Sequence, residues 1–130
     1  MEINLPDVVA EVTDVHDRYN AAIDAGDVTA LNGFFNEAPE TLRLGPAENL
    51  FGHAEIAGFR STKWSKAPTR TPVRTIVNTY GRDLAVATLL YTRPNEPGKI
   101  GRQMQTWARM PAGWRIVAAH VSVIDDPQKG

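Results

Sequence analysis

Apolar residues recur at helical spacing in the first part of the chain. They fall every three or four positions, at Leu5, Val8, Val9, Val12, Val15, Tyr19, Ala22 and Ile23. Pro6 suits the first turn of a helix, and Gly26 suits the position just after its last turn. The pattern therefore predicts a helix from Pro6 to Ala25.

Shorter segments follow this helix. Asp27 can cap a second, short helix, which Pro39 closes. The stretch TLRLG, residues 41–45, is typical of a short strand, and HAEIAGFRSTKW, residues 53–64, is typical of a third helix. We expect no other element before Pro68.

After Pro68 the spacing changes from helical to alternating. Four segments rich in β-branched residues follow, separated by connections that contain glycine or proline and suit hairpins: residues 70–81, 83–93, 99–110 and 113–124. Helices first and a meander of strands later predict an α+β fold, with three helices on one face of a curved antiparallel sheet. We expect a single domain over residues 1–130, with a frayed polar tail from about residue 125 to residue 130.

Composition and charge exclude several classes of protein. The chain has 130 residues, 14 of them basic and 15 acidic, and a net charge of −1. Without a basic stripe or tail, nucleic acid and anionic membrane are not expected partners. The absence of cysteine excludes disulfides and thiolate chemistry. The N-terminus lacks the features of a signal peptide, and no segment reaches transmembrane length, so we expect a soluble cytoplasmic protein.

Tyr19 lies on the apolar face of the first predicted helix, among valines. One interpretation is a core tyrosine whose hydroxyl bonds to a nearby acceptor. The other is a phenol that faces an enclosed cavity. Helical spacing alone is compatible with both.

Arg43 stands between Leu42 and Leu44, so strand alternation turns it to the opposite face. A buried guanidinium is costly unless it has a partner. Glu40 or Glu48 could pair with it, or the side chain could extend to water. Its planar fork is also well suited to holding the carboxylate of a substrate.

The last two strands carry polar residues within apolar surroundings. Gln103, Gln105 and Trp107 share one face by alternation, and repeated glutamines suit a polar cavity wall, or else face water. By alternation, His120 shares a face with Ile116, Ala118 and Ser122. It is either a structural histidine or a group that lines the same cavity.

The other residues that could take part in a functional site have no position that favours such a role. Arg60 follows Phe59 on the third predicted helix and could reach a pocket or the surface, whereas Arg70, Arg74 and Arg102 are expected mostly in water. The three histidines lack the spacing of metal ligands, and the chain has no nucleophile elbow, phosphate loop or dinucleotide fingerprint. We therefore expect a site with no metal and no cofactor.

Three segments of the chain resemble the AtzH-like family, also called the oxalurate-catabolism family, within the SnoaL-like and nuclear transport factor 2-like superfamily. They are INLPDVVAEV, TLRLGPAENLFGHAEIAGFR and GRQMQTWARMPAGWRIVAAHVS. Together with the order of elements, they extend the resemblance over nearly the whole chain.

The resemblance implies a cone-shaped, cystatin-like α+β fold, usually dimeric, with a pocket between the sheet and the helices. The activity characterised in the family converts 1,3-dicarboxyurea to allophanate, with loss of carbon dioxide or bicarbonate, in cyanuric acid catabolism. A tyrosine on the first helix and an arginine on the short strand are its proposed catalytic pair, and Tyr19 and Arg43 occupy these positions. Leu44, Pro46 and Phe51 depart from the family pattern and leave the substrate open between triazine and oxalurate pathways.

We therefore expect an enzyme for a small anionic urea derivative. In this hypothesis Arg43 binds a carboxylate, Tyr19 acts as general acid or base, and five residues bind substrate: Gln103, Gln105, Trp107, His120 and Arg60. A second hypothesis is a non-catalytic acid-binding or accessory protein associated with an amidase. A third, isomerase or cyclase chemistry, would need Asp24 or His120 as a base.

A homodimer is expected through the exposed face of the sheet. The sequence places apolar side chains on that face which need cover: Val73, Val77, Val86 and Val117.

Overall fold

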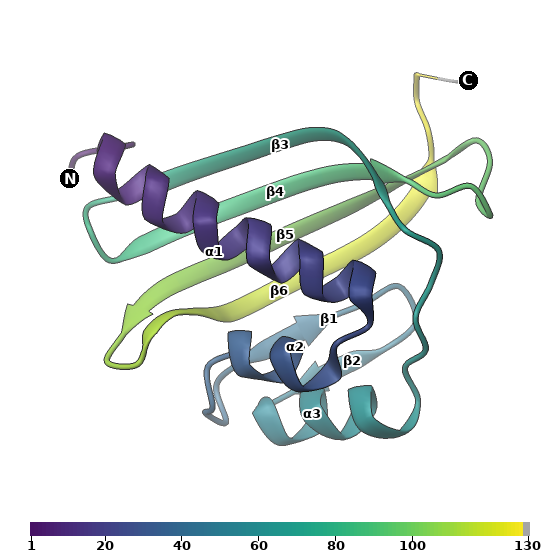
Figure 1. Cartoon of the computed structure of the whole chain (residues 1–130), viewed down its shortest axis with the longest axis horizontal. Coiled ribbons are helices and arrows are strands. Elements are labelled where there is room, and N and C mark those ends of the chain that lie inside the picture. The colour runs from purple at the N-terminus through teal and green to yellow at the C-terminus, as the bar shows by residue number, and fades with distance from the viewer. Residues whose placement is uncertain (129–130) are drawn as a thin grey trace.

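The computed structural model describes residues 1–128, which form three helices and a mixed sheet of six strands (Figure 1). The helices are α1 (Pro6–Ala25), α2 (Val28–Phe34) and α3 (His53–Thr62). The strands are β1 (Leu42–Leu44), β2 (Asn49–Phe51), β3 (Thr71–Tyr80), β4 (Leu84–Thr92), β5 (Lys99–Met110) and β6 (Gly113–Asp125). The α+β class predicted from the sequence is confirmed.

Helix α1 begins and ends where its sequence signals predicted. Proline occupies its first turn, and Gly26 follows it in the left-handed conformation at φ 71°, which glycine adopts without strain. Asp27 then caps α2, its carboxylate accepting a bond from the backbone N–H of Ala30 at 3.1 Å. The two helices therefore follow each other with no intervening loop, and α1 crosses in front of the long strands (Figure 1).

The sheet differs from the prediction in two respects. Its order is β2-β1-β6-β5-β4-β3, and β1 runs parallel to β6, so the expected purely antiparallel sheet is wrong. Strand β2 was not predicted, because it is defined by its pairing with β1 and not by a pattern of its own. It pairs with β1, with Leu50 opposite Arg43, and completes the edge of the sheet.

A β-bulge divides β6 into two registers. Trp107 of β5 pairs with Ile116, and Thr106 pairs with Ala118, so Val117 is an extra residue between them. Ile116 and Ala119 consequently face the helices, and His120 faces outward and is exposed. The prediction that His120 shares a face with Ile116 is wrong, because the bulge reverses the alternation.

The core lies between the inner face of the sheet and α1. Valines and Tyr19 of α1 pack against Trp107 and Ile116 of the sheet. Val77, which the sequence assigned to the exposed face, also packs against this core. Val73, which the sequence assigned to the same face, is exposed. The outer face exposes four further large apolar side chains, Leu42, Phe51, Leu84 and Met104.

The C-terminal segment is held as far as Asp126. Asp125 ends β6, and Asp126 is buried and donates its backbone N–H to the carbonyl of Gly98 at 2.9 Å. Residues 127 and 128 of the predicted frayed tail form a turn, and residues 129 and 130 lie outside the described residues. Over residues 1–128, none of the helices combines the length and apolarity needed to cross a membrane.

Candidate functional site

A cavity of about 240 Å³ lies between the C-terminal half of α1, the β1–β2 hairpin, the segment after α3 and the inner face of the sheet. This volume is enough for a small ligand and is closed by side chains from segments far apart in the sequence. Its lining residues are Tyr19, Ile23, Asp24, Arg43, Pro46, Ala47, Glu48, Phe59, Trp64, Ala67, Arg70, Tyr91, Arg93, Gln103 and Val121.

Tyr19 lines this cavity and is almost fully buried. Three aromatic rings hold its ring edge to face: Phe34 at 5.7 Å, Phe35 at 6.2 Å and Trp107 at 6.4 Å between centroids. Its hydroxyl oxygen accepts a hydrogen bond from Nη2 of Arg60 at 3.1 Å. The hydroxyl's own hydrogen is not used in that bond, so it can be donated into the cavity.

Arg60 lies behind Tyr19 and does not line the cavity. Its side chain is buried between the rings of Phe35 and Trp64, each 5.6 Å from the guanidinium carbon. Its Nε and Nη1 have no hydrogen-bond partner, and no carboxylate of residues 1–128 pairs with it. Burial lowers the pKa of the Arg60 guanidinium, and the oxygen of Tyr19 opposes that shift.

Arg43 combines two of the predicted alternatives. It is 8% exposed and lines the cavity, and its Nη1 donates to Oε1 of Glu48 at 2.6 Å. Its Nε is buried and has no hydrogen-bond partner among residues 1–128. Gly45 makes the ion pair possible, because an added Cβ there would overlap the Glu48 carboxylate.

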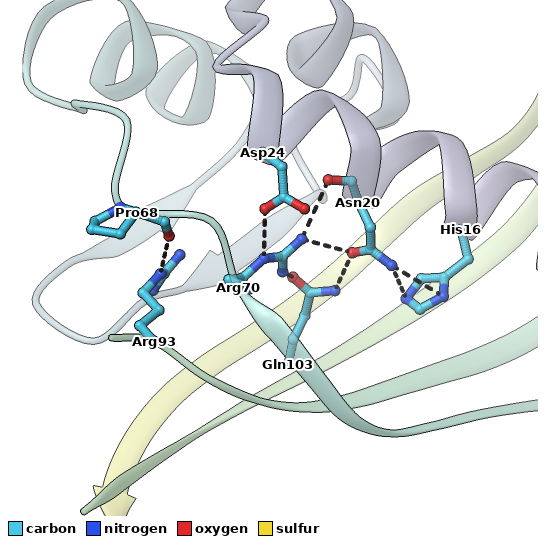
Figure 2. A network of polar contacts seen from close by, with 7 residues as sticks. All are labelled: His16, Asn20, Asp24, Pro68, Arg70, Arg93 and Gln103. Carbon is cyan, nitrogen blue, oxygen red and sulfur yellow. Dashed lines mark hydrogen bonds and ion pairs between the residues drawn. The ribbon is translucent and has the colours of Figure 1, made fainter. Parts of the chain in front are cut away.

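Arg70 is the centre of a polar network that the sequence did not reveal (Figure 2). Its Nη1 donates to Oε1 of Gln103 at 3.1 Å, its Nη2 to Oδ1 of Asn20 at 3.1 Å, and its Nε to Asp24 at 3.4 Å. Arg70 is 6% exposed, so the expectation that it lies in water is wrong. No local signal could have shown this, since its partners stand 33 to 50 residues away in the chain.

Tyr91 and Arg93 complete the wall next to Arg70. The guanidinium groups of Arg70 and Arg93 lie 5.3 Å and 5.1 Å from the centre of the Tyr91 ring. Arg93 also donates from Nε to the carbonyl of Pro68 at 3.1 Å (Figure 2). Neither residue was predicted from the sequence, because arginine and tyrosine at a strand end have no distinctive pattern.

The remaining sequence candidates lie in three places. Gln103 lines the cavity and donates to Oδ1 of Asn20 at 3.2 Å. Gln105 and Trp107 lie behind the cavity in the core, where Nε1 of Trp107 donates to Oε1 of Gln105 at 3.1 Å. His120 is on the outer face of the sheet. The fold thus brings Tyr19, Arg43 and Gln103 together around one space.

His16 continues the network on the other side of Asn20. The Nδ2 group of Asn20 lies 3.4 Å from one ring nitrogen of His16 and 3.5 Å from the other (Figure 2). Burial lowers the pKa of His16, Asp17 opposes this shift, and the nearby charge of Arg70 adds to it. The imidazole is therefore neutral at pH 7.

The charged groups that line the cavity are positive on balance. Its lining carries three guanidinium groups, those of Arg43, Arg70 and Arg93, against two carboxylates, those of Asp24 and Glu48. Among residues 1–128, no three His, Cys, Asp or Glu side chains are grouped so as to hold a metal ion. The chemistry available is anion binding by arginine and proton transfer by a phenol.

Solved structures from bacteria are similar to this chain over nearly its full length. A protein of unknown function from Pectobacterium atrosepticum is 46% identical, with a TM-score of 0.89 and 94% of each chain covered. A cystatin-like fold protein from Burkholderia xenovorans is 44% identical, with a TM-score of 0.93, and the match covers 98% of this chain and 99% of that one. A nuclear transport factor 2-like superfamily protein from Salmonella enterica serovar Typhimurium is 31% identical, with a TM-score of 0.72, and 93% of this chain and 94% of that chain are covered.

These likenesses establish the nuclear transport factor 2-like, cystatin-like fold. No curated protein sequence is a significant match. A family model described as AtzH-like matches residues 1–127.

Proposed function

The chain belongs to the AtzH-like family, and we propose that it is an enzyme that removes one carboxyl group from 1,3-dicarboxyurea to give allophanate. One observation carries this proposal: the phenol of Tyr19 and the guanidinium of Arg43 line the same small cavity. These are the positions to which the family resemblance assigns catalysis. The excess of arginines around them suits an anionic urea derivative.

In the proposed reaction, Arg43 binds a substrate carboxylate and Tyr19 supplies a proton. The bond between the urea nitrogen and the departing carboxyl carbon breaks, and its electron pair stays on nitrogen. That nitrogen takes the proton of Tyr19, carbon dioxide leaves, and the phenolate takes a proton back from water. The dianion and one proton thus yield the allophanate anion and carbon dioxide. Positioned proton transfer of this kind contributes about 10²- to 10⁴-fold in rate.

Arg60 fits this scheme as a positioning residue and not as a direct substrate ligand. Its Nη2 bonds to the oxygen of Tyr19, and no carboxylate of residues 1–128 neutralises it. When Tyr19 gives up its proton, the new negative charge lies beside this cation. Both side chains are buried, so that attraction is stronger than it would be at the surface.

The variant Tyr19→Phe tests the assignment of the phenol. Consumption of freshly generated 1,3-dicarboxyurea, corrected for spontaneous decay, should fall at least about 100-fold. The free energy of unfolding should also fall by about 1–3 kcal/mol, because the Arg60 guanidinium loses the hydrogen bond to the oxygen of Tyr19. Tyr80→Phe, which changes a tyrosine outside the cavity, is the matched control. Wild-type activity in Tyr19→Phe would show that the phenol is structural.

The variant Arg43→Lys tests the binding role of the guanidinium. Lysine keeps the charge but loses the planar fork, so the affinity for substrate should fall while the folded state persists. Arg18→Lys, on the exposed side of α1, should leave affinity unchanged. Treatment with a chelator should also leave turnover intact, because the proposed chemistry needs only side chains.

The alternative is a non-catalytic protein that binds a small acid or supports an amidase. It is favoured by the composition of the lining, which contains no Ser, Thr, Cys, His or Lys within the described part of the chain. Purified protein that binds malonate but does not speed the loss of 1,3-dicarboxyurea would favour this alternative.

We also propose a homodimer that forms through the outer face of the sheet. Four large apolar side chains on that face are more than a third exposed: Leu42, Phe51, Leu84 and Met104. Covering such a patch stabilises an assembly. An amidase is the second partner that the family resemblance suggests.

A further inference from the structure

A second group of cations lines the cavity, apart from Arg43. Arg70 and Arg93 lie over the same aromatic ring, that of Tyr91, at 5.3 Å and 5.1 Å. We call these two side chains the Tyr91 arginine pair. Asn20, Asp24 and Gln103 hold Arg70 in place, so this part of the wall is already ordered without a ligand.

The Tyr91 arginine pair carries one positive charge in excess. Arg70 pairs with the carboxylate of Asp24 at 3.4 Å. Arg93 donates from Nε to a neutral carbonyl, and no carboxylate within residues 1–128 pairs with it. Its two terminal nitrogens are therefore available as a fork for an anion.

The pair is separate from the Arg43 group. Arg43 stands on β1, whereas Arg93 follows the last residue of β4, and β6 and β5 lie between these strands. Arg43 has its own acidic partner in Glu48. The cavity thus presents guanidinium groups from two places in the sheet, and the total lining charge is positive by one.

We propose that the Tyr91 arginine pair is a second anion subsite, so that the cavity selects small dicarboxylates over monocarboxylates. One carboxylate binds at Arg43, and the other binds at the fork of Arg93, with the remaining N–H of Arg70 beside it. This inference deepens the proposed function and rests on its assignment of the cavity as the substrate site. Arg93 becomes the residue that determines specificity for a doubly charged substrate.

Calorimetric titration of the wild-type chain with malonate and with acetate at neutral pH tests this inference. Malonate should bind at least about tenfold more tightly than acetate, which corresponds to one additional charge-assisted hydrogen-bonded contact. In Arg93→Gln this ratio should fall close to one, mainly through weaker malonate binding. Arg74→Gln, which removes the same charge from an exposed position outside the cavity, should keep the wild-type ratio.

Arg93→Lys gives a second measurement that does not depend on the folding of Arg93→Gln. It keeps the charge but loses the fork, so its ratio should lie between those of the wild type and Arg93→Gln. Equal affinities for the two anions in the wild type would overturn the inference. It would also be overturned by a malonate preference that survives in Arg93→Gln, or by one that is lost equally in Arg74→Gln. Binding does not require turnover, so selective malonate binding without 1,3-dicarboxyurea consumption would support the subsite and contradict the proposed reaction.

Discussion

At the scale of single residues, Arg60 has the most unusual surroundings. It is a buried cation whose described neighbours are two aromatic rings and the oxygen of Tyr19. Burying an unpaired guanidinium costs stability, so the core alone does not explain its presence. A role in supporting Tyr19 does explain it.

The variant Arg60→Met separates stability from activity. Methionine fills the space between Phe35 and Trp64 without a charge, so thermal stability should be unchanged or higher. The kcat should nevertheless fall at least about tenfold, because the phenolate loses its neighbouring cation. KM should change little, since Arg60 does not line the cavity.

Melting curves and steady-state kinetics on Arg60→Met and Arg60→Lys measure these effects. The lysine variant should recover part of the lost kcat, because it restores the charge. A purely structural Arg60 would instead show a large loss of stability with kcat preserved in the folded fraction.

The lowered pKa of His16 predicts how the stability of the protein depends on pH. Burial lowers its pKa in the folded state below the ordinary value of about 6.5, which the unfolded chain keeps. Below that pH the unfolded state binds more protons than the folded state, so stability falls as the solution becomes more acidic. Above about pH 6.5 both states are neutral at this residue, and His16 adds no pH dependence.

Thermal melts between about pH 7.5 and about pH 5.5 can test this expectation. The wild type should lose up to about 1.4 kcal/mol for each pH unit below the unfolded-state pKa. His16→Leu should lose less over the same interval. Parallel curves for the two proteins would mean that another group controls acid stability.

At the scale of elements, the packing of β4 on β5 sets the shape of the cavity. Gly101 of β5 stands opposite Tyr91 of β4, and an added Cβ at Gly101 would overlap the Tyr91 ring. Glycine therefore lets this ring lie across the sheet, where it carries both guanidinium groups of the Tyr91 arginine pair. A change in the backbone at Gly101 should therefore move the Tyr91 arginine pair.

Gly101→Ala should therefore weaken both folding and ligand binding. The displaced ring should cost about 1–3 kcal/mol of stability, the usual effect of overpacking. Malonate affinity should fall with it, because Arg70 and Arg93 move with the ring. Gly58→Ala is a matched control in α3, where an added Cβ meets nothing within 4 Å. Gly58→Ala should raise the free energy of unfolding by about 0.5–1 kcal/mol, because alanine has the higher helix propensity. Equal effects of the two variants on malonate binding would contradict the link between Gly101 and the Tyr91 arginine pair.

At the scale of the whole molecule, the outer face of the sheet is expected to join two copies. Light scattering on the wild type should give twice the chain mass of 14.3 kDa. Met104→Glu places a charge among the exposed apolar side chains of this face and should shift the mass to that of one chain. Ala21→Glu, on the exposed side of α1, should leave it unchanged. A wild-type monomer at micromolar concentration would contradict the proposed dimer.

Local patterns in the sequence predicted most of the elements. The spacing of valines, the first-turn proline and Gly26 were sufficient for α1, since helical periodicity and capping depend on neighbours in the chain. Alternation likewise located the four long strands to within about one residue at most ends. Strand β2 and the parallel pairing of β1 with β6 were missed, because both depend on which segments meet after folding.

The candidate site was predictable only in part, for the same reason. Tyr19 and Arg43 were selected from their positions and the family resemblance, and both line the cavity. The bulge at Val117 turned His120 away, and folding buried Arg70 among partners distant in sequence. Side-chain periodicity is thus a property of one segment. The direction of a residue beyond a bulge and the partner of a buried charge are determined by contacts between segments, which only the tertiary structure decides.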